Sequence, residues 1–297
     1  MTTTQEMIET TRSYLTASEI GVLDTLASAY TSGGVTLTFS ASVDNISPGA
    51  VVSIDLEVFI VTAFDASAKT VTVIGGQAGS TAANHSSGAL VRIAPEFTDF
   101  QILREINFDL ADLSSPSNGL FAITDVTITY NNSISGYDLT SATAVIDILE
   151  VKYDESGSEK IWPVIPAQRW DLKRRSDTTD FASGFALVLY GAESGRTIRV
   201  AYSKPFVSLS AVGDVVETVS GLPATAIDIP PLGAARRLIQ IKELQRNLMA
   251  AQRDSRRPVE VPAGALTGAA RTLAEMRAER IAAEATRLRS DWPHRRH

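Results

Sequence analysis

Few residues in this sequence have the types and spacing that catalysis or metal binding needs. His294 and His297 lie at the chain end, with no nearby groups to complete a tetrahedral metal site. Asp109 and Asp112 are three residues apart on an expected helix, where a solvated face is a simpler interpretation than an acid–base pair. The sequence contains no cysteine, no Gly-x-Ser-x-Gly elbow and no His-Glu-x-x-His. We therefore expect no enzyme activity, no metal and no cofactor.

A glycine-rich segment, residues 75–88, resembles a phosphate-binding loop in composition. It lacks the Gly-Lys-Ser/Thr ending of such loops, and no apolar helix follows it. We therefore expect a long structured turn in which His85, the remaining histidine, is a polar pin.

Length and composition limit the possible classes of protein. A chain of 297 residues with 44% hydrophobic residues is long enough for about two domains with real cores. No stretch approaches the ~20 apolar residues of a membrane span, and residues 1–6 do not begin a secretion signal. The net charge of −7 argues against tight wrapping of nucleic acid.

Hydrophobic periodicity divides the chain into five segments and predicts an α+β fold that is mostly β. Its parts are a small β-barrel-like domain, an antiparallel β-sandwich, and N-terminal, bridging and C-terminal helices. The expected segments are an N-terminal helical segment over 1–34, a small β-barrel of about five strands over 35–94, a bridging helix over 95–119, a β-sandwich of five to seven strands over 120–226, and a basic helical arm over 227–297.

The C-terminal arm differs from the rest of the chain in charge. Two helices are expected there, over about 234–252 and 267–290, joined by a linker with Pro and Gly. From Gly233 to His297 there are 14 Arg or Lys and 7 Asp or Glu, which gives +7, so residues 1–232 carry −14. The apolar stripe of the second helix is too thin to form a core alone, so we expect it to need another surface.

Three aromatic residues in or beside the expected sandwich strands have two possible roles. Trp162, Trp170 and Tyr190 would form the platform of a carbohydrate- or receptor-binding module. Packing in the sandwich core is the simpler interpretation of Trp162 and Trp170, because large aromatic side chains are mostly buried.

The order of several motifs resembles that of siphophage neck proteins, the head-to-tail connectors or adaptors of tailed bacteriophages. The run from Val71 to Val91 resembles a strand-and-turn unit of their virion proteins, with Ser80-Thr81, Ala83 and His85 in the pattern. The helix from Phe97 to Leu113, the sandwich and the linker over 257–264 follow in the same order.

This resemblance implies a structural virion protein that is made in the host cytoplasm. It would form a homo-oligomeric ring, a dodecamer as is common in this family, that joins the portal protein to a downstream neck or tail-completion protein. Double-stranded DNA would pass through its lumen, and an acidic wall would keep DNA from adhering. Alternatives are another neck or tail protein, such as a stopper or tail terminator, and the carbohydrate- or receptor-binding tail module.

The arm is the expected contact with the portal or a neighbouring subunit. Guanidinium groups would form bidentate pairs with carboxylates of the partner, although DNA binding and pairing within the helix, as between Arg280 and Glu284, are alternatives. The candidate partner-binding residues are Arg236, Arg237, Leu238, Ile241, Arg246, Arg256, Arg257, Leu273, Arg277, Arg280, Ile281, Arg287, Leu288 and Trp292.

Overall fold

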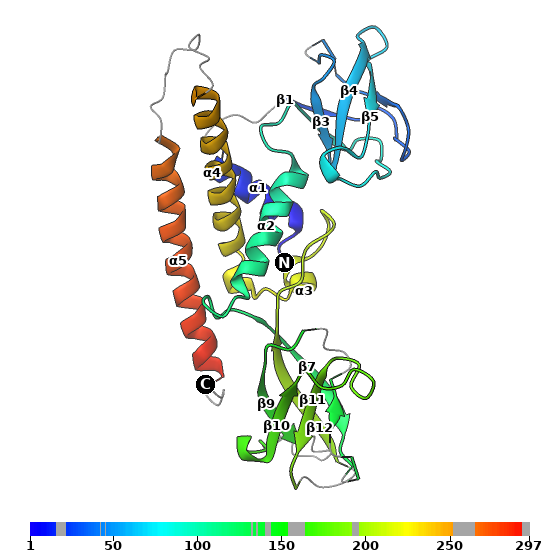
Figure 1. The fold of residues 1–297 in the computed structure, drawn as a ribbon. Helices are drawn as coiled ribbons and strands as arrows, with labels where there is room; N and C mark the ends of the chain where they lie inside the picture. The colour runs from blue at the N-terminus through cyan, green and yellow to red at the C-terminus, as the bar shows by residue number, and fades with distance from the viewer. Residues whose placement is uncertain are drawn as a thin grey trace. The chain divides into compact units, whose positions relative to one another are not determined.

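A computed structural model describes the chain except for residues 16–21, 42, 45, 132, 135, 140–143, 154–163, 192–195, 252–264 and 293–297, and it leaves out the side chains of 246–251 and 265. The chain divides into two compact units, which are described separately (Figure 1). The first comprises residues 1–109, 209–219 and 227–278, and the second 110–208, 220–226 and 279–297. The fold is α+β, with one six-stranded and two three-stranded antiparallel sheets, as expected.

The first unit contains a small antiparallel barrel. Its strands are β1 (Val22–Thr25), β2 (Thr36–Thr38), β3 (Val51–Ile54), β4 (Glu57–Asp65), β5 (Thr70–Ile74) and β6 (Leu90–Ile93), in the order β1-β6-β3-β4-β5-β2. A bridge between Leu26 and Phe39 joins the two edge strands and closes the sheet. Alternate residues such as Val52, Phe59 and Val73 point into a buried apolar core.

Among the described residues, the N-terminal helical segment expected over 1–34 is helical only in its first part, and the remainder of this expectation is wrong. Helix α1 (Thr4–Leu15) begins with a capping box, in which Thr3 Oγ1 accepts from the Glu6 amide and Glu6 accepts from the Thr3 amide. Residues 22–25, however, form β1, paired with β6 from Val22–Ile93 to Thr25–Leu90. Pairing with a strand almost 70 residues later in the chain outweighed the local helical pattern.

Five described α-helices accompany the barrel in the first unit, three of them only in part. They are α1, the first part of α2 (Asp99–Leu113), most of the short α3 (Val216–Ser220), α4 (Ile229–Ala251) and the first part of α5 (Ala265–Asp291). Helix α2 also starts with a capping box, between Thr98 and Gln101. Helix α4 begins five residues earlier than expected, because Pro230 and Pro231 are tolerated in the first turn, where amides have no helical partner.

The second unit contains two three-stranded sheets with a common core. One has the order β7-β12-β9 and the other β10-β11-β8, with Trp170, Leu187 and Tyr202 among the core residues. The short strands β8 and β10 were not expected, and most of the strand expected over 160–165 lies outside the described residues. The strands are β7 (Ala122–Thr129), β8 (Tyr137–Asp138), β9 (Asp147–Tyr153), β10 (Trp170–Arg174), β11 (Phe185–Leu189) and β12 (Thr197–Lys204).

Candidate functional site

A histidine and two carboxylates meet at one end of the barrel. His85 is 3% exposed, and its Nδ1 and Nε2 lie 2.9 Å from Asp55 and Glu57, respectively. Asp55 lies in the β3–β4 turn and Glu57 is the first residue of β4, while the backbone of His85 pairs with Tyr30. Burial lowers the pKa of His85, but the hydrogen bonds to Asp55 and Glu57 outweigh it and hold the pKa above its ordinary value.

The glycine-rich segment wraps around this cluster. The Glu57 carboxylate accepts from the amides of Gly76, at 3.1 Å, and Ala83, at 2.8 Å, which are the donors that a phosphate-binding loop would offer to its ligand. A Cβ at Gly75 would overlap the Glu57 carboxylate. The interpretation of a structured turn pinned by His85 is confirmed, because both ring nitrogens contact carboxylates of the β3–β4 hairpin.

A second buried carboxylate anchors the C-terminal helices. Asp109 of α2 is fully buried, and Arg277 of α5 contacts it twice, with Nε 3.1 Å and Nη2 3.0 Å from its two oxygens. Arg237 of α4 lies 3.9 Å away, and Gly233 of α4 is so close that a Cβ there would overlap the carboxylate. The expectation that Asp109 belongs to a solvated face is therefore wrong, whereas Asp112 is half-exposed.

The apolar stripe of the arm packs within its own unit. Leu273 and Ala270 of α5 contact a cluster formed by Leu232, Ala235 and Ile239 of α4. Tertiary packing within the chain thus supplies the surface that the thin stripe of α5 needs, at least over this part of the helix.

The candidate partner-binding residues differ widely in accessibility. Those buried within the chain cannot make a first contact with a partner, so a contact made by the arm must use the exposed and half-buried ones. Leu238, Leu273, Arg277, Ile281 and Leu288 are buried; Arg236, Arg237, Arg280, Arg287 and Trp292 are half-buried; Ile241 is exposed; Arg246, Arg256 and Arg257 lie outside the described side chains.

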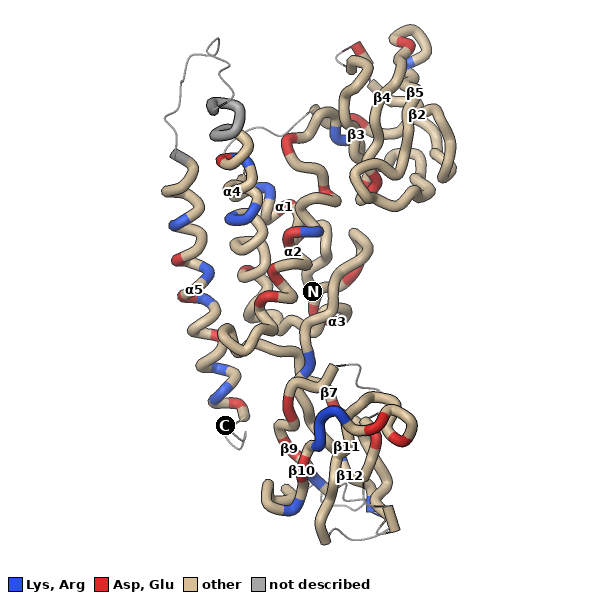
Figure 2. Tube along the Cα trace, in the orientation of Figure 1, with Lys and Arg blue, Asp and Glu red and all other residues tan. Residues whose placement is uncertain are grey.

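Acidic residues neutralise most of the described arginines of α5. Cations and anions alternate along this helix (Figure 2). Arg271 pairs with Glu275, Arg280 with Glu284, and Arg287 with both Glu284 and Asp291. The expected pairing between Arg280 and Glu284 is confirmed, and this arrangement offers little uncompensated charge for a DNA backbone.

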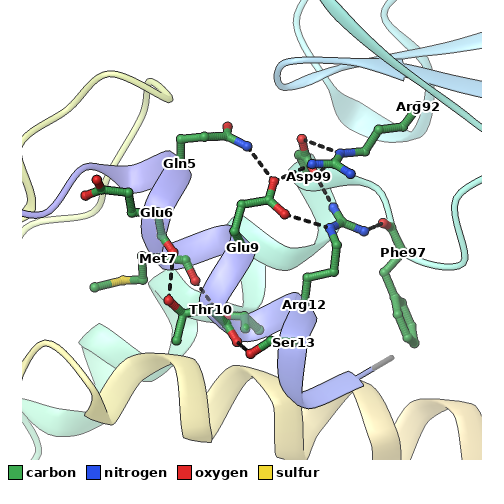
Figure 3. A network of polar contacts seen from close by, with 11 residues as sticks. Gln5, Glu6, Met7, Glu9, Thr10, Arg12, Ser13, Arg92, Phe97 and Asp99 are labelled. Atoms are coloured by element: carbon green, nitrogen blue, oxygen red, sulfur yellow. Dashed lines mark hydrogen bonds and ion pairs between the residues drawn. The ribbon is translucent and has the colours of Figure 1, made fainter. Parts of the chain in front are cut away.

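A third charged network was missed by the sequence analysis. Arg12 and Glu9 of α1, Arg92 of β6 and Asp99 of α2 form linked ion pairs, and Arg12 also donates to the Phe97 carbonyl at 3.0 Å (Figure 3). Burial raises the pKa of Asp99, while Arg12 and Arg92 lower it less. A lone arginine within the apolar strand Leu90–Ile93 was the available signal, because a charge at a buried position is almost always paired.

The three proposed platform aromatics do not form a described ligand surface. Trp170 is 5% exposed and belongs to the sandwich core, which confirms the packing interpretation for this residue. Tyr190 is 51% exposed, and Trp162 lies outside the described residues. No observation therefore favours the carbohydrate-binding alternative.

The outer face of the barrel carries a row of branched aliphatic residues. Val51, Ile60 and Ile74 are direct cross-strand neighbours on β3, β4 and β5. Ile60 is 36% and Ile74 55% exposed, while Val51 is half-buried. We call this set the aliphatic row. Single exposed apolar residues are ordinary, but a contiguous group is typical of an interface.

Comparison with known proteins gave no further assignment, since no protein-family model and no curated protein matches this sequence. None of the helices that the structure describes has the length and apolar content of a membrane span. The described residues also contain no group of three or more His, Asp or Glu side chains arranged to hold a metal ion.

Proposed function

We propose that this protein is a structural subunit of a bacteriophage neck, in which copies form a head-to-tail adaptor ring between the portal and the next neck component. The order of the sequence motifs suggested this assignment, and the distribution of charge and apolar surface supports it. In this role the protein is a virion component without catalytic activity.

One observation carries the proposal: buried charged residues hold the elements of the chain together, whereas aliphatic residues are exposed on the barrel. The clusters around Asp109, Asp99 and His85 use charged groups within the chain, where buried pairs fix how elements pack. The aliphatic row remains outside, in a form suited to a neighbouring subunit. A ring needs such repeated lateral contacts, because each copy touches two neighbours through two different surfaces.

The acidic N-terminal region also fits a DNA channel. Residues 1–109 contain 12 Asp or Glu and only 4 Lys or Arg, and two of those cations, Arg12 and Arg92, lie in the network of Figure 3. Glu57, Asp99, Glu105 and Asp109 are buried, but the remaining acidic residues still outnumber the cations. Such an excess of carboxylates repels the DNA backbone, which favours passage over adhesion. In this proposal the arm mainly packs within the subunit, and its accessible side chains contact the portal.

Replacement of Ile60 tests the proposal. Ile60→Asp puts a charge in the middle of the aliphatic row on a side chain that already reaches solvent, so we expect the subunit to fold but not to form rings. Ala68→Asp, in the exposed β4–β5 turn, is the control that keeps the same added charge. Light scattering after size-exclusion chromatography should give a ring mass for the wild type and the control, and a monomer or dimer mass for Ile60→Asp. Unchanged ring formation by Ile60→Asp would exclude the aliphatic row as the subunit contact.

A further inference from the structure

Strand β7 forms an edge of its sheet. It pairs with β12 on one side, from Ala122–Lys204 to Thr129–Thr197, and no other described strand pairs with its second side. In an antiparallel edge strand, alternate N–H and C=O groups point away from the sheet and can pair with another chain.

This edge lacks the features with which proteins usually block such pairing. β7 has eight residues without proline or lysine, and its register with β12 is free of bulges. Its one charge, Asp125, pairs with Arg199 of β12. By contrast, the edge strand β10 carries exposed Asp171, Lys173 and Arg174.

The core beneath β7 is also incompletely covered. Val126 and Ile128 face the core of the second unit but are only half-buried. Their cross-strand partners on β12, Val200 and Ile198, are fully buried. An additional strand beside β7 would remove this remaining apolar surface from water.

We propose that β7 pairs antiparallel with β7 of a second copy, with the two Val126 residues opposite each other, so that one six-stranded sheet runs through the dimer. This inference does not depend on the neck assignment.

The sequence of β7 selects this register over its neighbours. With Val126 on the twofold axis, seven of the eight residues pair, Asp125 faces Thr127, and Thr124 faces Ile128 on the core side. Placing Asp125 on the axis would oppose two like charges. Placing Thr127 on the axis would leave only five paired residues within the strand. Shifting the register by one residue would place the core-facing side chains of one copy on the outer face of the shared sheet.

Single cysteines test the pairing directly, because the chain has none of its own. In the proposed register two Val126 Cα atoms lie about 4.5–5.5 Å apart, within reach of a disulfide. Two Thr129 residues would be about 20 Å apart along the strands. Under mild oxidation Val126→Cys should form a disulfide dimer on a non-reducing gel, and Thr129→Cys should not. Absence of the Val126→Cys dimer, or equal cross-linking of both variants, would overturn the proposal.

Charged substitutions at Thr127 distinguish an effect on dimer formation from an effect on folding. Within the chain Thr127 lies opposite Arg199, so Thr127→Asp favours the fold and Thr127→Lys disfavours it. In the dimer residue 127 faces Asp125 twice, so the effects reverse: Thr127→Asp should raise the dimer Kd about tenfold and Thr127→Lys should lower it. Sedimentation equilibrium measures this dimer Kd in full chains that also carry Ile60→Asp, so that ring formation does not mask it. An Ile60→Asp chain that stays monomeric, or charge variants that shift the Kd in the other direction, would show that the edge is unpaired or takes a strand of a different protein.

Discussion

Asp109 fixes the position of three helices through one carboxylate. Its oxygens contact Arg277 of α5 and lie near Arg237 of α4, and the glycine at 233 leaves room for them. A buried ion pair adds little to the free energy of folding, because desolvation offsets much of the Coulomb attraction; its main effect is to fix how the helices pack. Removing one member of a buried ion pair is costly, because the remaining charge has lost its solvation without the full compensating attraction.

Asp109→Asn tests this anchor. The substitution keeps the shape of the side chain but removes the buried negative charge that Arg277 contacts, and breaking a buried ion pair from one side typically costs about 3–5 kcal/mol. We expect chemical denaturation to show a loss of this size in the free energy of unfolding. Arg271→Ala is the control, because Arg271 is 81% exposed and its pair with Glu275 contributes at most about 1 kcal/mol. A loss for Asp109→Asn as small as that of the control would show that the anchor is not needed.

The histidine cluster makes stability depend on pH in a defined direction. The folded-state pKa of His85 is raised, so its stabilising contribution is fully present below about pH 6.5, the ordinary histidine pKa, and is lost as pH rises through the folded pKa. The urea midpoint of the wild type relative to His85→Gln should therefore decline across this window. A difference that stays constant with pH would contradict the assignment.

A milder variant checks the same cluster without removing the histidine. Asn tolerates the positive φ of 50° at position 55. Asp55→Asn should consequently keep the turn and lower the pKa of His85, because one of the two carboxylates that favour the imidazolium is gone. NMR titration of the His85 ring measures the shift, and an unchanged or higher pKa would be the contrary result.

At the scale of elements, α5 belongs to the packing of its own chain. It supplies Ala270 and Leu273 to the cluster on α4 and Arg277 to Asp109. Among the described residues, the barrel core contains none from α5. Within the first unit, α5 therefore stabilises the helices rather than the barrel.

Deletion of residues 254–297 should separate these contributions. We expect amide hydrogen exchange to accelerate in α4 and in α2, because both lose contacts, while β4 and β5 of the barrel keep their protection. Unchanged protection of α4 would show that α5 adds nothing to the helical packing, and loss of protection in the barrel would show that the sheets depend on it.

Local periodicity predicted the elements whose burial follows from neighbours in the chain. The small barrel, the bridging helix that contains Leu103 and Leu110, and the strand-rich sandwich were expected from period-two or period-3.6 patterns. Strand β1 and the placement of Asp109 could not be predicted in this way. Both depend on residues far apart in the sequence: β1 on β6, and Asp109 on Arg277, 168 positions later.

At the scale of the whole molecule, the chain contains surfaces of different kinds. Buried carboxylate clusters hold together elements of the first unit, the aliphatic row is exposed on the barrel, and β7 presents an open backbone edge. The proposed ring uses the aliphatic row, and the proposed dimer uses the free edge of β7. The two contacts can therefore be tested independently by variants at Ile60 and Thr127.

Electron microscopy of the purified protein shows directly whether its copies assemble into a ring. We expect closed rings with a central channel, in which the barrel of each subunit contacts the next subunit through Val51, Ile60 and Ile74. Particles that remain single subunits or dimers at every concentration, with no rings, would contradict the proposal.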